Sequence, residues 1–408
     1  MQLLFVTLSQ VLVIHIVGVG LDTDSYLAAQ AVPSVLIAMV TSVLQSVWLS
    51  RLTILSDDVV IWRKEQSILQ GQTALLGGGL FLLAGLSITL WLPFLYPTFE
   101  AEQQQIIMEF CLLMLVAALI NTQSALLTVA MRARNRILIA ELVALLGTLF
   151  SFVCIYFAVP VWGLNAAVWI NLARAILVYV VQLSLANWPP ISLKNGWACK
   201  ETWTLMKPMF IASVVYKSSP IVDRYFASLG KSGDITILGI SQMIINGLST
   251  ITERSIGINL SLKIIQMLKS NNKNANILMY FQIKFIQVAI LSAFMLLLLL
   301  TLSSNYSGEL GSLFCGGKEN GAELIKLLIG LIPFYVVSSL GSALTQYYSF
   351  HKDIKILAIV GIVGNLAGIL VKGLGYFAGG VLGLVVSISL SSLLNMLVNY
   401  AIIKKKYA

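Results

Sequence analysis

Long apolar segments alternate with short polar loops along the whole chain. About 20 consecutive apolar residues allow a helix to cross a bilayer, and we place two sets of such segments. The first set covers roughly residues 1–20, 25–50, 67–95, 106–130, 137–159 and 162–186. The second covers roughly residues 207–229, 233–262, 276–303, 322–348, 354–377 and 380–403. Because unpaired backbone groups exclude open sheets from lipid, the pattern predicts an all-α polytopic membrane protein with about 12 transmembrane helices.

Composition and charge agree with this interpretation. Of the 408 residues, 58% are hydrophobic and 11% are charged, whereas soluble domains are about a quarter charged. The net charge is +9, but the basic residues lie mainly in every second loop, which is typical of cytoplasmic loops. We therefore expect both termini in the cytoplasm and no nucleic-acid partner. The main basic positions in these loops are Arg51, Arg63, Arg132, Arg134, Arg136, Lys194, Lys263, Lys352 and Lys404.

The two sets of segments resemble each other, which indicates an internal duplication. The offsets between matching positions are 210 to 220 residues, and the matches keep their order along the chain. The matching groups are Gly20 and Asp24 with Gly230 and Asp234, Ser124-Ala125-Leu126 with Ser342-Ala343-Leu344, and Tyr156-Phe157-Ala158 and Gly163 with Tyr376-Phe377-Ala378 and Gly383. Internal repeats are a signature of transporter folds. An even number of spans per repeat gives two parallel lobes around a central cavity.

A break in the apolar pattern sets the predicted lobe boundaries. Trp188-Pro189-Pro190 interrupts the apolar residues between the sixth and seventh spans. We predict a six-helix N-lobe over residues 1–186, a cytoplasmic linker over residues 187–206, and a six-helix C-lobe over residues 207–408.

The seventh predicted span carries charges at depths where charge is costly. One Arg, Lys or Asp at mid-helix costs about 2.5–3.5 kcal/mol on an insertion scale. Lys217 and Arg224 are seven residues apart, so they lie within about 20° of each other on a helix and about 10 Å apart in depth. Asp223 points about 100° away from Arg224. Pro220 lies between the two cations and is expected to bend the helix.

Other charges also fall within predicted spans. Arg174 and Lys372 add to a positive balance that favours an anionic substrate, most simply a phosphate or pyrophosphate. We therefore predict a cationic substrate-binding cavity formed by four residues: Arg224, Lys217, Arg174 and Lys372. Five further residues are candidates for supporting or gating roles: Asp223, Asp24, His15, Glu253 and Arg254.

Structural roles remain open for the same residues. Asp223 and Arg224 could be a buried pair that fixes helix packing. The side chains of Arg174 and Lys372 could extend to an interface. Glu253 and Arg254 also suit cytoplasmic packing, and His15 suits a simple polar contact.

Catalytic and metal-binding patterns are missing from the sequence. The two histidines and four cysteines show no spacing typical of a metal site, a Ser/His/Asp triad or a redox motif. We expect neither an enzyme nor a bound cofactor or metal.

Two short motifs resemble the MurJ/MviN lipid II flippases. Val222-Asp223-Arg224-Tyr225-Phe226-Ala227-Ser228-Leu229-Gly230, followed by Gly233, is similar to their seventh-helix signature. Thr23-Asp24-Ser25-Tyr26-Leu27-Ala28-Ala29, with Pro33, is similar to the start of their second helix. That family belongs to the multidrug/oligosaccharidyl-lipid/polysaccharide (MOP) exporter superfamily. The resemblance implies that Arg224 and Asp223 act as a cavity pair, with Arg224 near a pyrophosphate.

The departures from the family pattern concern basic residues. The family's first-helix cations are missing, with His15 near one such position, and Ala31 stands where a basic residue is common. The substrate class therefore stays open between a lipid II-like molecule and a surface-polysaccharide repeat unit.

The sequence as a whole predicts an alternating-access flippase. Its cargo would be a polyprenyl-pyrophosphate-linked saccharide, and its setting the bacterial cytoplasmic membrane. Its partners would be this lipid-linked anionic oligosaccharide and membrane lipids, with glycan-assembly enzymes as further candidates. Two alternatives are a drug/cation antiporter of the multidrug and toxin extrusion (MATE) type and a non-transporting membrane scaffold.

Overall fold

A computed structural model describes most of the chain. The described residues are 2–43, 52, 59–134, 136–186, 193–194, 210, 213–214, 217–257, 260, 274–340 and 354–407, and regular structure among them is helical throughout. Most of the predicted linker over 187–206 lies outside these residues, as does the repeat segment Ser342-Ala343-Leu344.

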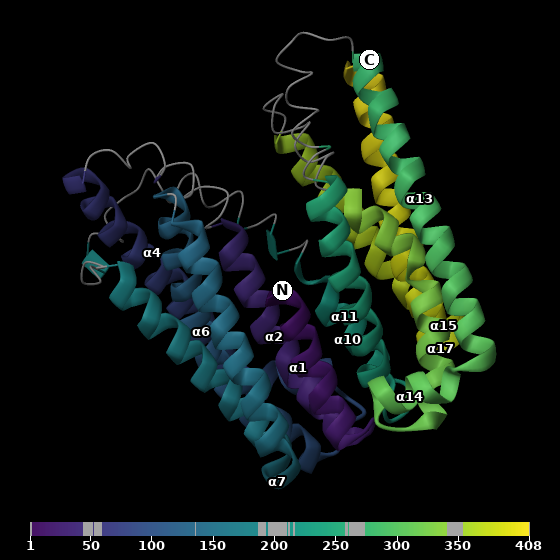
Figure 1. The fold of residues 1–408 in the computed structure, drawn as a ribbon, viewed down its shortest axis with the longest axis horizontal. Coiled ribbons are helices and arrows are strands. Elements are labelled where there is room, and N and C mark those ends of the chain that lie inside the picture. The colour runs from purple at the N-terminus through teal and green to yellow at the C-terminus, as the bar shows by residue number, and fades with distance from the viewer. Residues whose placement is uncertain are drawn as a thin grey trace. The chain divides into compact units, whose positions relative to one another are not determined.

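The chain forms two compact units, the first of which covers Met1–Leu229. In this unit α6 packs against α2, α4 and α7, and α1 packs against α7 (Figure 1). Its last helix, α10, packs against α2. The helices are α1 (Gln2–Val17), α2 (Leu21–Val43), α4 (Val59–Leu86), α5 (Ile88–Leu95), α6 (Ala101–Ala133), α7 (Ile137–Ala186) and α10 (Ser219–Ser228).

The second unit covers Gly230–Ala408. The helix α15 contacts four other helices, α11, α13, α14 and α17, and so lies at the centre of this unit. A bend of 45° separates α15 from the helical residues Ile332–Leu340. The helices are α11 (Asp234–Thr252), η2 (Glu253–Gly257), α13 (Asn274–Asn305), α14 (Ser307–Cys315), η3 (Lys318–Asn320), α15 (Gly321–Gly330) and α17 (Ile354–Tyr407).

Two of the helices are each long enough to cross a bilayer twice. α7 has 50 residues and α17 has 54, and a straight helix of that length would be about 75–80 Å long. Each is interrupted by a glycine with positive φ, namely Gly163 (φ 61°, ψ −151°) and Gly380 (φ 60°, ψ −145°). Only glycine readily adopts this conformation. α7 and α17 are therefore helical hairpins, as the predicted pairs of spans require.

Close packing between the hairpin arms depends on small residues. A Cβ atom on Gly375 would lie 1.7 Å from Ser387 Oγ, and one on Gly147 would lie 2.2 Å from Val178 Cγ2. Gly375 and Ser387 are on opposite sides of the turn at Gly380. The arms of each hairpin therefore fold back on each other, with backbones too close for a larger side chain at these positions.

The apolar surface agrees with a membrane setting. Among the described residues, seven helices are long and apolar enough to cross a bilayer, or eight if the bent pair after Lys318 counts as one span. Only 11% of the most apolar part of α13 is buried inside the protein, and its side chains Ile290 and Phe294 are each 65% exposed. The chain is thus a multi-pass helical membrane protein.

Two local features differ from the sequence-based expectation. The short helix α14 precedes α15 where a loop was expected. In addition, Gly163 shares its backbone conformation with Gly380 and not with Gly383. The two turns are therefore related by an offset of 217 residues, three fewer than the match of Gly163 with Gly383 implies.

Candidate functional site

Arg224 lies on α10 and contacts the backbone of α2. Its Nη1 atom donates a hydrogen bond to the Leu27 carbonyl oxygen. The neighbouring Asp223 is 4% exposed, and its carboxylate attracts the Arg224 guanidinium. An arginine has five N–H donors, and the described hydrogen bond uses one of them.

Two more hydrogen bonds hold α2 and α10 in place. The Tyr96 hydroxyl donates to the Ala28 carbonyl oxygen at 3.0 Å, and the Thr98 hydroxyl donates to the Ser228 carbonyl oxygen at 2.5 Å. The segment after α5 therefore touches both helices. Arg224 is positioned by this arrangement, which joins residues far apart in sequence.

Lys217 and Pro220 lie at the start of α10. Lys217 is partly buried and directly precedes a turn at Ser218. Pro220 occupies the first turn of α10, where its missing N–H group has no helical partner to lose. Ser218 keeps helical dihedral angles (φ −75°, ψ −12°), and its N–H donates to the Val214 carbonyl oxygen, so the bend expected at Pro220 stays a prediction.

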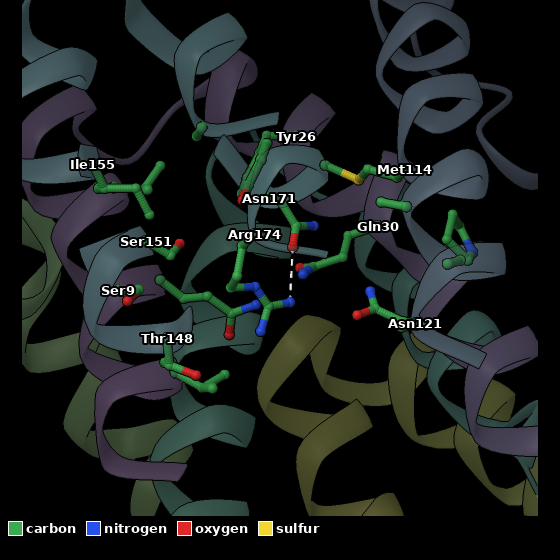
Figure 2. Close-up of a pocket in the computed structure, with 18 of the residues that line it drawn as sticks. Ser9, Tyr26, Gln30, Met114, Asn121, Thr148, Ser151, Ile155, Asn171 and Arg174 are labelled. Carbon is green, nitrogen blue, oxygen red and sulfur yellow. Dashed lines mark hydrogen bonds between the residues drawn. The ribbon is translucent and has the colours of Figure 1, made fainter. Parts of the chain in front are cut away.

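Arg174 faces a cavity of about 160 Å³ inside the first unit. Residues of α1, α2, α6 and α7 line it, and Figure 2 shows the Arg174 side chain pointing into it. Nη2 of Arg174 donates a hydrogen bond to Asn171 Oδ1 at 2.9 Å. Among the described lining residues, Arg174 carries the only formal charge.

Polar and apolar residues share the remaining lining of this cavity about equally. Tyr26, Gln30, Asn121 and Ser151 project toward the space around Arg174 (Figure 2). These neutral side chains were not predicted as site residues, although polar residues in the middle of apolar segments are the signal that could have found them. Their convergence depends on which helices face each other.

The predicted cationic residues belong to different parts of the chain. Lys217 and Arg224 belong to the end of the first unit, and Arg174 belongs to its cavity. Lys372 is on α17 in the second unit, where it is 5% exposed, so protein rather than lipid surrounds this charge. The role of the four residues in substrate binding stays a prediction.

The supporting candidates also occupy different environments. Asp24 is 1% exposed in the first turn of α2. His15 is exposed near the end of α1. Glu253 is partly buried at the start of η2, and the side chain of Arg254 lies outside the described part of the structure. Within the described residues, no group of three His, Cys, Asp or Glu side chains could hold a metal ion.

Comparisons with known proteins find similarity at the level of structure. No protein-family model and no curated protein sequence matches the chain. A solved structure of the lipid II flippase MurJ in an inward closed conformation matches with a TM-score of 0.81 and 15% identity, covering 99% of this chain and 86% of that chain.

Transporters of the MATE type match as well. An inward-facing MATE family transporter of the MOP superfamily has a TM-score of 0.68 and 16% identity, covering 100% of this chain and 96% of that chain. A MOP superfamily transporter from Pyrococcus furiosus, described as having a binding pocket of reverse polarity, has a TM-score of 0.53 and 14% identity, covering 97% of each chain.

These matches confirm the expected fold class, which was predicted from hydropathy and repeats, and they agree with the resemblance to the MurJ/MviN flippases. They extend over the whole chain, and each of the three structures is a MOP-type transporter or flippase. The chain has the helical membrane fold of the MOP superfamily, with MurJ among its structural neighbours.

Proposed function

We propose that the protein is a flippase for a polyprenyl-pyrophosphate-linked saccharide. The observation that carries this proposal is the guanidinium of Arg224, which is held against the α2 backbone by the Leu27 carbonyl oxygen. The Leu27 acceptor is uncharged and the neighbouring Asp223 carboxylate attracts Arg224, and a guanidinium held in this way can bind a diphosphate through two parallel hydrogen bonds. The structural neighbour with a TM-score of 0.81 is a lipid II flippase, which supports the same substrate class.

The mechanism we propose is alternating access. The diphosphate and the sugar bind at the basic residues, while the polyprenyl tail stays in the lipid. Arg224 and Lys217 take the first contact with the diphosphate in this scheme, and Asp223 keeps Arg224 in place through its charge. Arg174 and Lys372 complete the positive field, and Asp24, His15, Glu253 and Arg254 take supporting or gating roles.

The proposed location of the protein is a membrane with a defined orientation. The chain lies in the bacterial cytoplasmic membrane with both termini in the cytoplasm, because basic loop residues favour that side. Its partners are the lipid-linked oligosaccharide and the surrounding lipids. Enzymes that assemble the same glycan are further candidate partners.

A drug/cation antiporter is the second candidate function. The MATE-type neighbour covers this chain completely and has nearly the same length, which favours it. However, cation exchange needs an acidic side chain in the membrane interior, and the cavity lining in the first unit carries a single arginine and no carboxylate among its described residues. A membrane scaffold without transport is the third candidate.

Transfer of a fluorescent lipid between leaflets tests the proposal. The wild-type protein is reconstituted in vesicles with a fluorescent polyprenyl-pyrophosphate sugar, and the rate at which the label becomes accessible on the opposite leaflet is measured. We expect Arg224→Ala to reduce this rate at least tenfold, because the loss of one charge-assisted contact corresponds to about 1.5–3 kcal/mol. Arg224→Lys should give an intermediate rate, because lysine keeps the charge without the planar donors.

Arg136→Ala is the matched control. Arg136 is exposed in the segment between α6 and α7, so its loss should leave the rate unchanged. Equal rates for wild type and Arg224→Ala would refute the role of Arg224. A wild-type rate no faster than that of empty vesicles would favour the scaffold, and proton- or sodium-driven uptake of an organic cation would favour the antiporter.

A further inference from the structure

The cavity in the first unit has the properties of a binding site for a small ion. It is partly open and offers about 160 Å³ between helices of a single unit. A water molecule occupies about 30 Å³ in the liquid, so an ion with a few water molecules fits.

Charge decides which kind of ion suits the cavity. Arg174 supplies one positive charge, and no Asp or Glu is present among the described lining residues. An arginine facing a cavity within the membrane is costly unless a counter-charge is near. Asn171 satisfies one donor of Arg174 through its side-chain oxygen, but it supplies no negative charge.

An unsatisfied polar atom lies in the same cavity. The Oε1 atom of Gln30 is buried and has no hydrogen-bond partner among the described residues. The two ends of a side-chain amide can exchange by a simple rotation, so Gln30 can present its NH₂ group to a ligand. Figure 2 shows Gln30, Asn121 and Asn171 beside the end of the Arg174 side chain. Each of these amides can donate to an anion.

From these observations we propose that the cavity binds one small monovalent inorganic anion, of the size and charge of chloride, between Arg174 and the amides of Gln30, Asn121 and Asn171. A single positive charge balances a single negative charge. A phosphate or diphosphate would bring excess negative charge into a membrane interior, which is unfavourable. Arg224 is not among the residues that line this cavity, whereas Arg174 also belongs to the positive field proposed for the diphosphate.

Thermal unfolding in different salts tests this site. The purified full chain is placed in nanodiscs, and tryptophan fluorescence reports the unfolding midpoint as chloride replaces gluconate at constant ionic strength. An anion that binds the folded state stabilises it by mass action. We therefore expect a saturable rise of the midpoint for the wild type, and bromide should replace chloride.

Variants of the cavity make the test specific. Arg174→Gln should abolish the rise, whereas Arg174→Lys should keep it at a chloride concentration about tenfold higher, because lysine retains the charge without the guanidinium fork. Gln30→Leu keeps a similar volume and should weaken the chloride response. Arg136→Gln, which removes an exposed arginine, should respond like the wild type.

Three results would overturn the proposal. The first is a wild-type midpoint that does not depend on chloride, and the second is an unchanged chloride response in Arg174→Gln. The third is stabilisation by inorganic pyrophosphate that exceeds that of chloride and is lost in Arg174→Lys, which would assign the cavity to a diphosphate. If Arg174→Gln does not fold, Arg174→Lys and Gln30→Leu still decide the matter, because unchanged responses in both would also refute the site.

Discussion

Arg224 and Arg174 both depend on neutral groups for their described hydrogen bonds. Arg224 donates to the backbone oxygen of Leu27, and Arg174 donates to the side-chain oxygen of Asn171. Hydrogen bonds to such oxygens fix the orientation of a guanidinium without neutralising it. Two consecutive residues of α2 are involved, because Tyr26 lines the Arg174 cavity while Leu27 accepts from Arg224.

Sequence reasoning at the residue scale identified the charges but not their surroundings. Arg174 and Arg224 were recognisable because charge is rare in apolar segments. The side chains that line the Arg174 cavity include neutral amides such as Gln30 and Asn121, which are distributed over α2 and α6 and carry little signal on their own. Only the packing of α1, α2, α6 and α7 brings these side chains to one cavity.

Cys315 at the end of α14 allows a prediction about thiol reactivity. Burial raises the pKa of the Cys315 thiol, and the nearby carboxylate of Glu323 adds to this effect, so that the pKa rises from 9.0 to about 11. At pH 8 about one thiol in a thousand is then ionised, against about one in ten for an unperturbed group, and the thiolate is the reactive form. We expect iodoacetamide to modify Cys315 about 100-fold more slowly in the folded than in the denatured protein.

The pH dependence of this reaction distinguishes charge from access. Alkylation is followed by mass spectrometry in a variant in which Cys111, Cys154 and Cys199 are replaced by serine. The rate should rise with pH up to about pH 11. Glu323→Gln removes a negative charge beside the thiol, so the pKa should fall and the rate at pH 8 should increase. A rate that levels off near pH 9 would contradict the expected pKa.

At the scale of single elements, the hairpin turns of α7 and α17 were foreseeable and α14 was not. Glycines and a proline interrupt the apolar pattern near Gly163 and Gly380. The two spans within α7 and the two spans within α17 were therefore predicted correctly. The helix α14 has 9 residues, too few to produce a transmembrane signal. Its helical form depends on contacts with η3 and α15, which the sequence does not reveal.

The turn of α17 offers a comparison between two adjacent glycines. Gly380 has φ 60° and ψ −145°, whereas Gly379 has φ −151° and ψ 22°. A side chain at Gly380 would be strained by about 1–3 kcal/mol, although a Cβ atom would meet nothing within 4 Å at either position. We expect Gly380→Ala to lower the unfolding midpoint clearly, while Gly379→Ala has little effect. Equal midpoints for the two variants would show that the backbone conformation of Gly380 does not limit stability.

For the molecule as a whole, the main prediction was the number of times the chain crosses the membrane. The sequence predicted about 12 crossings, and the hairpins α7 and α17 account for four of them. The similarity to MOP transporters extends over 97–100% of the chain in the three structures compared, so the fold class was predictable from hydropathy, repeats and two motifs. The arrangement of the lobes over residues 1–186 and 207–408 stays a prediction.

Side-specific labelling tests the predicted orientation. Lys318 between α14 and α15 and Lys405 near the end of α17 are both exposed. In a cysteine-free background, a membrane-impermeant maleimide should modify Lys318→Cys in intact cells. It should modify Lys405→Cys only after the cells are permeabilised, because basic residues such as those at the C-terminus favour the cytoplasm. The reverse pattern would invert the orientation of the whole chain.

The continuous apolar character of α17 has a consequence for biosynthesis. Its two arms are joined at Gly380 without a polar loop, so the ribosome delivers 54 residues that contain no hydrophilic stop between the crossings. The membrane-insertion machinery cannot use a polar segment there to decide where the first arm ends. The two arms can therefore enter the lipid as one hairpin, with the turn at Gly379 and Gly380 marking where the first arm ends.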